Sequence, residues 1–118
     1  MRKVLGVANV HKKMTMKKGK KYFYYRVIIP HSVLERLGLS HAEYVLFKKK
    51  SHDVQLVRVT DASATETYHC MGIQKIGTRG RICLPKKAVA FFKIADDDIY
   101  LKFVELEKND IRLRKIGV

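Results

Sequence analysis

Arg81-Ile82-Cys83-Leu84-Pro85 repeats the pattern of Arg26-Val27-Ile28-Ile29-Pro30, 55 residues earlier in the chain. Each stretch consists of one basic residue, three apolar residues and a proline. Three further positions match at the same offset: Leu39 with Ile94, Glu43 with Asp98, and Leu46 with Leu101. A pattern that recurs at a fixed offset indicates an internal repeat.

The match continues on both sides of this stretch. Downstream, Val54-Gln55-Leu56 resembles Ile111-Arg112-Leu113, and upstream residues 6–10 resemble residues 72–76. Between the copies, small polar residues without hydrophobic periodicity read as a linker. We therefore expect a first repeat at 1–60 with a basic loop at 11–21, a linker at 61–67, and a second repeat at 68–118.

Each copy is predicted to fold as strand, strand, helix and hairpin. A proline opens each helix, Gly38 suits the left-handed cap of the first, and Lys93 stands in its place in the second. The expected strands are 4–10, 22–29, 44–48 and 54–59 in the first copy, and 68–76, 81–84, 99–104 and 111–116 in the second. A unit of about 50 residues cannot bury its core alone. We expect a mainly β fold, with two β-β-α-β-β repeats and two short helices closing one barrel across a pseudo-two-fold axis.

The second copy resembles the swapped-hairpin AbrB / MazE / SpoVT DNA-binding domain. The resemblance rests on residues 72–76, on 80–88 with their Gly80-Arg81 dipeptide and Pro85, on Asp98 and on 111–113. The first copy matches from Arg26 onward but has Tyr25 in place of the glycine. The resemblance implies a barrel with exchanged hairpins, duplex DNA as the partner, and a role as transcription regulator, antitoxin or chromatin-type protein. Many small basic members are archaeal, which suggests an archaeal or archaeal-virus origin.

Charge points to a polyanionic partner independently. The chain has 25 Lys and Arg against 11 Asp and Glu, a net charge of +14. Residues 1–60 hold 14 of these cations and 3 of the acids. Self-repulsion of this size costs stability, and neutralising DNA phosphates would relieve it. The alternative is a basic surface that serves solubility only.

The resemblance also indicates a binding face, formed by the first turn, the strand before proline and the helix start. Arg26 and Arg81 match the family's Gly-Arg arginine. The remaining candidates are Lys12, Lys13, Lys17, Lys18, Lys20 and Lys21 in the first turn, Lys75 and Arg79 around the second, and Lys86 and Lys87 at the second helix start. Some members carry arginines four and five residues after proline, where this chain has Leu34, Glu35, Val89 and Ala90. We therefore expect mainly phosphate contacts, weak sequence specificity and an asymmetric footprint.

Several of these features have a second interpretation. The 11–21 loop could be a solvated tail without a partner, and Lys48-Lys49-Lys50 a solvated turn or a secondary nucleic-acid contact. The aromatic run 22–25 could stack on bases, although strand alternation predicts half of it in the core. Asp96-Asp97-Asp98 suggests a turn cap rather than a cation site.

No catalytic motif occurs, and we predict neither an enzyme nor a cofactor, metal or small-molecule substrate. Cys70 and Cys83 are expected to be reduced core thiols, with a disulfide as the alternative. No apolar run is long enough to span a membrane, so we expect a cytoplasmic, nucleoid-associated protein. Homodimer formation stays open. An RNA-binding protein is the closest rival, followed by an antitoxin, which would need a toxin-wrapping segment not expected after 111–116, or an adaptor barrel.

Overall fold

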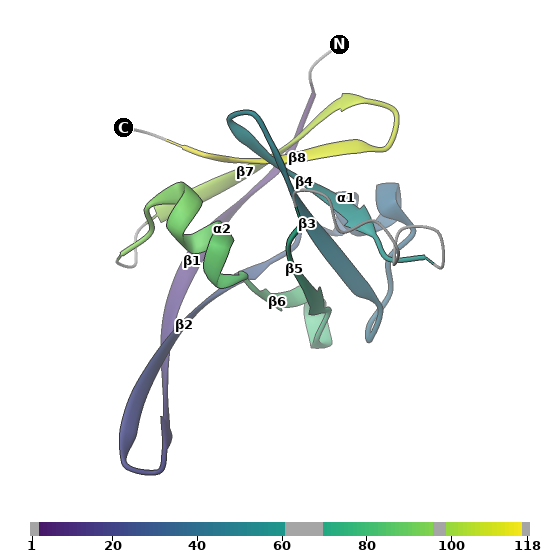
Figure 1. Cartoon of the computed structure of the whole chain (residues 1–118). Coiled ribbons are helices and arrows are strands. Elements are labelled where there is room, and N and C mark those ends of the chain that lie inside the picture. The colour runs from purple at the N-terminus through teal and green to yellow at the C-terminus, as the bar shows by residue number, and fades with distance from the viewer. Residues whose placement is uncertain (1–2, 61–69, 96–98, 117–118) are drawn as a thin grey trace.

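Strands make up most of this chain. The computed structural model describes residues 3–60, 70–95 and 99–116. Within them the elements follow in the order β1 (Lys3–Lys17), β2 (Lys20–Ile28), α1 (His31–Leu37), β3 (Tyr44–Lys50), β4 (Asp53–Arg58), β5 (Cys70–Lys75), β6 (Arg81–Cys83), α2 (Lys86–Phe92), β7 (Ile99–Glu107) and β8 (Asp110–Lys115), as Figure 1 shows. The mainly β prediction with two short helices is confirmed. The linker expected at 61–67 and the Asp96-Asp97-Asp98 cluster lie outside the described residues.

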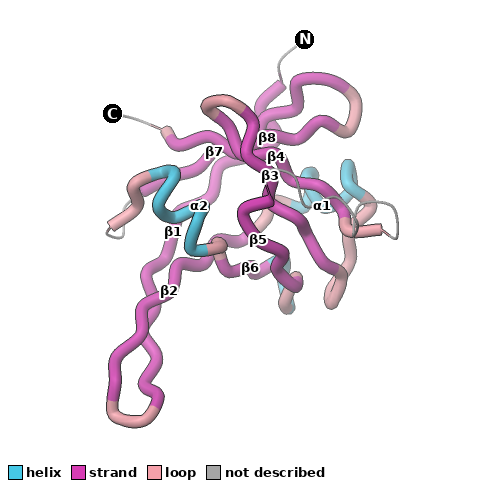
Figure 2. The backbone as a smooth tube through the Cα atoms, viewed as in Figure 1, coloured by secondary structure: helices cyan, strands magenta, loops and turns pink. Residues whose placement is uncertain are grey.

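The strands join in one antiparallel sheet with the order β5-β3-β4-β8-β7-β1-β2-β6. This sheet curls into a nearly closed barrel, with β5 and β6 as its edges (Figure 2). Near these edges, the Gly77 N–H donates to the Arg81 carbonyl at 2.7 Å. The expectation of one barrel built from both halves of the chain is therefore met.

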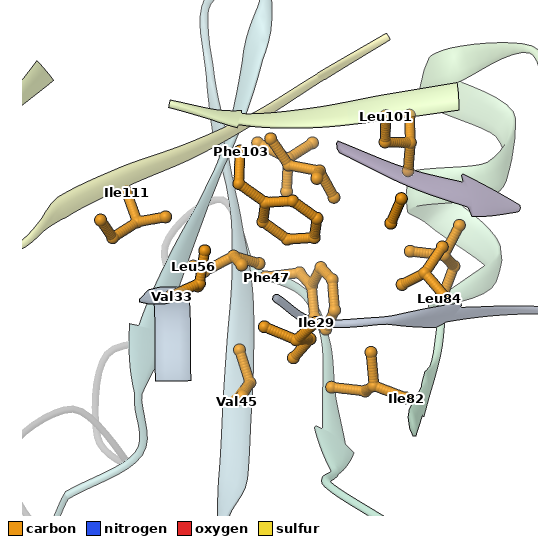
Figure 3. Close-up of a cluster of buried hydrophobic side chains, with 14 of the residues drawn as sticks. Ile29, Val33, Val45, Phe47, Leu56, Ile82, Leu84, Leu101, Phe103 and Ile111 are labelled. Carbon is orange, nitrogen blue, oxygen red and sulfur yellow. The ribbon is translucent and has the colours of Figure 1, made fainter. Parts of the chain in front are cut away.

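Apolar side chains from both halves fill the barrel (Figure 3). Phe47 and Phe103 are each 1% exposed. In the β3–β4 and β7–β8 ladders, Phe47 lies opposite Leu56 and Phe103 opposite Leu113. Burying each such side chain contributes about 1.5–3 kcal/mol. The barrel interior is thus a packed core that stabilises the fold.

Several strand pairings occur twice, the second time with the roles of the two halves exchanged. Strand β1 pairs with β7, and β5 pairs with β3. In the β2–β6 ladder Val27 lies opposite Ile82, flanked by the pairs Arg26–Cys83 and Ile28–Arg81. Ile29 donates its N–H to the Gly80 carbonyl at 2.9 Å, and Leu84 donates to the Tyr25 carbonyl at 2.8 Å. Tyr25 therefore occupies the backbone position that glycine occupies in the second half.

One sequence match is wrong by one residue. The sequence match aligned Leu46 with Leu101. In the sheet, however, Leu101 lies opposite Ala8, and the matched residue Gln74 lies opposite Val45, so Val45 is the true counterpart of Leu101. Phe47 and Phe103 are the corresponding core residues. The 55-residue offset therefore holds through the helices and fails before β7, because apolar runs in the two hairpins can be aligned in either register.

The segment predicted as a basic loop at 11–21 is not a loop. Strands β1 and β2 continue to pair from His11–Arg26 to Lys17–Lys20. Lys18 and Gly19 close the hairpin with φ angles of 52° and 79°, as a two-residue type I′ turn requires. Val10 is the last residue of β1 that pairs with β7, and Arg26 is the first residue of β2 that pairs with β6. We call residues 11–25, which lie between them, the arm. In Figure 1 the arm projects from the barrel at the lower left.

Candidate nucleic-acid interface

Acidic residues are absent from two long stretches of the sequence. The first acid in the chain is Glu35, and none occurs between Glu66 and Asp96. Strands β1, β2, β5 and β6 lie entirely within these stretches. They form the part of the barrel from which the arm extends, so the cations here lie on strands whose own sequence contains no carboxylate.

The acids within the described ranges lie on the helix α1, just before β3 and along the two long hairpins, and several of them pair with arginines. Arg58 contacts Glu43 at 2.8 Å, and Arg114 contacts Asp53 at 2.6 Å. Arg112 bridges Asp110 at 2.8 Å and Asp53 at 3.3 Å. The tips of β3–β4 and β7–β8 lie at the end of the barrel opposite the arm (Figure 1). At that end, Asp53 and Asp110 pair with Arg112 and Arg114, so part of the positive charge is compensated.

Asp53 is the one buried charged residue in the described part of the chain. Burial alone would raise the pKa of its carboxyl group, but hydrogen bonds and charge from Arg114, reinforced by Arg112, lower the pKa below its ordinary value. Asp53 therefore stays ionised and ties β4 to β8. This network contributes to stability at the end away from the arm.

The β2–β6 ladder brings Arg26 and Arg81 onto one face. Successive side chains alternate between the two sides of a strand, and Val27 and Ile82 are buried. Arg26 and Arg81 must therefore point outward, on neighbouring strands. This juxtaposition was predicted from the sequence match.

The arm divides its predicted lysines between two faces and a tip. His11, opposite Arg26, extends the outward face into the arm, where Lys13, Lys17 and Lys20 follow. Lys12 and Lys21 lie on the other face, and Lys18 is in the turn. Lys17 lies directly opposite Lys20, and like charges in that position destabilise a hairpin. Hairpin stability therefore does not explain the lysines.

The candidates from the second half are less concentrated. Arg79, with φ of 60°, sits in the turn before β6 and lines a shallow hollow with Ile28 and His31. Lys75 ends β5, and Lys86 and Lys87 are exposed at the start of α2. Lys87 lines a different hollow, with Lys49 and Phe91. The structure thus joins Arg79 to the region of Arg26 and Arg81, and directs Lys87 toward a separate surface.

Sequence reasoning missed an apolar face on the arm. Met14, Met16 and Phe23 are 50%, 54% and 56% exposed, although no role was predicted for the methionines. The expectation that half of the aromatic run lies in the core is also wrong. Tyr22 is 47% exposed, and within the run Tyr25 alone packs against the core. The reason is that the hairpin runs past the barrel; the Lys18-Gly19 turn signal between alternating residues could have revealed it.

The remaining predictions on chemistry concern thiols, metals and membranes. Cys70 and Cys83 form no disulfide and are only half-buried, so the expectation that they lie in the core is wrong. Within the described ranges, no three His, Cys, Asp or Glu side chains group closely enough to hold a metal ion. Neither helix in those ranges has the length and apolar character needed to cross a membrane.

The comparisons with known proteins return nothing: no family model, no curated protein and no solved structure matches the chain.

Proposed function

We propose that this protein binds double-stranded DNA through one cationic face, as a transcription regulator or a chromatin-type protein. The observation that carries the proposal is the joining of Arg26, Arg81 and the arm lysines on strands that contain no carboxylate. Lys and Arg neutralise phosphates and release the counterions that condense on DNA, which supplies most non-specific affinity. The opposed lysines of the arm would then be stabilised by the ligand.

We further infer that the barrel is the swapped-hairpin arrangement of two β-β-α-β-β repeats. The exchanged pairings β1–β7 and β5–β3 support this, as do the equivalent contacts of two glycines. A Cβ added to Gly6 would meet Pro30 at 2.7 Å, and one added to Gly72 would meet Pro85 at 2.7 Å. The AbrB / MazE / SpoVT resemblance then adds a reason to place DNA on the β2–β6 face.

Phosphate contacts position a protein on DNA without reading its sequence. Lysine is a point charge and lacks the planar, two-pronged donor set with which arginine recognises guanine. A face in which lysines outnumber arginines therefore favours weakly specific binding. The arm belongs to one half only, so the footprint should be longer on one side of the β2–β6 ladder.

The test is a titration of labelled duplex DNA, single-stranded DNA and duplex RNA with the full chain over a range of salt concentrations. We expect duplex DNA to bind best, with a log–log salt slope of about −4 to −8. If duplex RNA binds as tightly as duplex DNA or more tightly, RNA and not DNA is the ligand. A flat salt dependence for all three polymers would contradict the proposal.

A matched pair of variants locates the face. Arg26→Gln with Arg81→Gln removes two charges from the β2–β6 ladder. Lys49→Gln with Lys108→Gln removes two exposed charges from the hairpins at the opposite end. We expect the first pair to weaken DNA binding at least tenfold and the second by less than about twofold, because screening limits the reach of surface charge to about 10 Å. Equal losses would show that the assigned face is wrong.

A further inference from the structure

The arm has two unlike faces. In its ladder Met14 lies opposite Phe23 and Met16 opposite Lys21, so the three apolar side chains share one face. The other face carries Lys13, Lys17 and Lys20 together with two tyrosines, Tyr22 and Tyr24. A cationic face alone would suffice for phosphate contact, so the apolar face needs an occupant of its own.

The base of the arm is held in place. The carbonyl oxygen of Ala95 accepts a hydrogen bond from the Tyr25 hydroxyl at 3.0 Å and another from Lys12 Nζ at 3.2 Å. The same ammonium group lies 4.6 Å from the centre of the Phe23 ring. These contacts fix where the arm leaves the barrel and set the orientation of its apolar face. A preorganised element loses less conformational entropy when it binds.

Charge decides between the candidate occupants. An exposed apolar patch of this kind marks an interaction surface. A second copy of the chain would bring another +14 to a patch bordered by lysines, which opposes association. A polyanion that also offers apolar contact is complementary to both faces at once, and duplex DNA does so where thymine methyl groups line the major groove.

We propose that the arm lies in the major groove of duplex DNA, with Met14, Met16 and Phe23 against the base edges and the lysines of both arm faces reaching phosphates on either side. Two-stranded ribbons twist strongly, so the apolar face of the arm and the outward Arg26–Arg81 face at its base turn toward the same duplex. This groove assignment rests on the proposed DNA-binding function and adds that the arm contacts the base edges. The major groove, about 12 Å wide, admits a two-stranded ribbon, whereas the minor groove is only about 6 Å wide. Long lysine stems can pass along apolar surface and place their ammonium groups on the phosphates.

The specific consequence is a preference for thymine methyl groups. Removing that methyl converts thymine to uracil and leaves the Watson–Crick pairing intact. We expect an alternating dA–dT duplex to bind more tightly than an alternating dA–dU duplex, by about fourfold for each methyl group that the arm buries. Phosphate contacts alone would give no such difference.

The experiment compares both duplexes with the wild-type chain and two variants. The first variant, Met14→Thr with Met16→Thr and Phe23→Thr, removes the apolar face and keeps residues that favour strands. The second, Tyr22→Thr with Tyr24→Thr, is its control on the opposite face of the same hairpin. Thermal unfolding should be nearly unchanged in both, because the substituted side chains lie outside the barrel core.

We expect the thymine preference to disappear in the first variant and to persist in the control. A wild-type chain without the preference, or a first variant that retains it, overturns the groove assignment, while steep salt dependence on both duplexes would leave the proposed function standing. Absence of duplex binding by the wild type would instead remove the proposed function itself. A DNA-free wild-type dimer in sedimentation, abolished in the first variant, would assign the patch to a second copy.

Discussion

The two halves of the barrel differ most at one point, the connection between their first two strands. In the second half, residues 77–80 make a tight turn between Ile76 and Arg81; in the first half, residues 11–25 form the arm between Val10 and Arg26. The flanking backbone is the same, since the Gly80 and Tyr25 carbonyls accept equivalent hydrogen bonds from the other half. A connection between two barrel strands can therefore be lengthened into a hairpin while the hydrogen bonds on either side stay the same. The side chains of such a hairpin are not needed for the barrel core, so they can serve in binding.

The largest expected effect comes from making the two halves alike. Replacing residues 11–25 with Gly-Thr-Arg-Gly, the sequence of residues 77–80, removes the six arm lysines. We expect DNA binding to weaken about a hundredfold or more, with a salt slope shallower by about 3–5, because each lost phosphate contact removes about 0.9. Titrations of duplex DNA at several salt concentrations measure both.

The same graft tests whether the arm is separable from the barrel. Because the core contains no arm residue other than the partly buried Tyr25, circular dichroism should show a folded chain with a cooperative thermal transition. An unfolded graft would mean that the arm is part of the folding unit. A folded graft with wild-type affinity would mean that the arm is not a binding element.

The second comparison is between the two ends of the barrel. The arm end is cationic, whereas at the other end carboxylates pair with arginines. Asp53→Asn removes the carboxylate that Arg112 and Arg114 share, and should destabilise the fold by about 2 kcal/mol because it leaves two guanidinium groups underpaired. DNA affinity should be unchanged, since Asp53 lies away from the arm. Chemical denaturation and DNA titration of the same sample measure the two quantities.

The pH dependence of Asp53 follows from the direction of its pKa shift. Its pKa is lower in the folded chain than in the unfolded chain, so its contribution is fully present above the unfolded pKa of about 4. That contribution is lost as pH falls through the folded pKa. Below pH 4 the free energies of unfolding of wild type and Asp53→Asn should therefore converge. A constant gap down to pH 2 would show that the carboxylate charge is not what stabilises β4 against β8.

Arg26 and Arg81 test whether DNA contacts both halves. The two arginines occupy equivalent outward positions in the β2–β6 ladder. We expect Arg26→Gln and Arg81→Gln each to weaken binding by about fivefold to tenfold, as for loss of one charge-assisted contact. A loss confined to Arg26→Gln would indicate that the arm half binds DNA alone.

The sequence predicted the parts of the molecule in which the two halves agree. The apolar triplets before Pro30 and Pro85, together with the turn positions, were enough to predict one mainly β barrel, and the arginine match predicted the Arg26–Arg81 face. The arm was missed because lysines dominate residues 11–21, and the short alternation of Met14 and Met16 with polar neighbours, which is typical of a strand, was not weighed against them. The register of β7 was missed because adjacent apolar residues, such as Leu46 and Phe47, fit either alignment.

The smallest expected effect concerns the helix ends, where the halves differ by one side chain. Gly38 and Lys93 end α1 and α2 with φ angles of 65° and 54°, and each next residue donates its N–H back into the helix. Only glycine adopts this conformation without strain, so Lys93→Gly should stabilise the fold by about 0.5–1 kcal/mol and Gly38→Lys should destabilise it by at least as much. Thermal unfolding of the two variants and of the double exchange measures this. If the two single substitutions change the free energy of unfolding in opposite directions and nearly cancel in the double exchange, both helix ends obey the same backbone rule. If Lys93→Gly is destabilising instead, the lysine side chain contributes more to stability there than the relief of backbone strain.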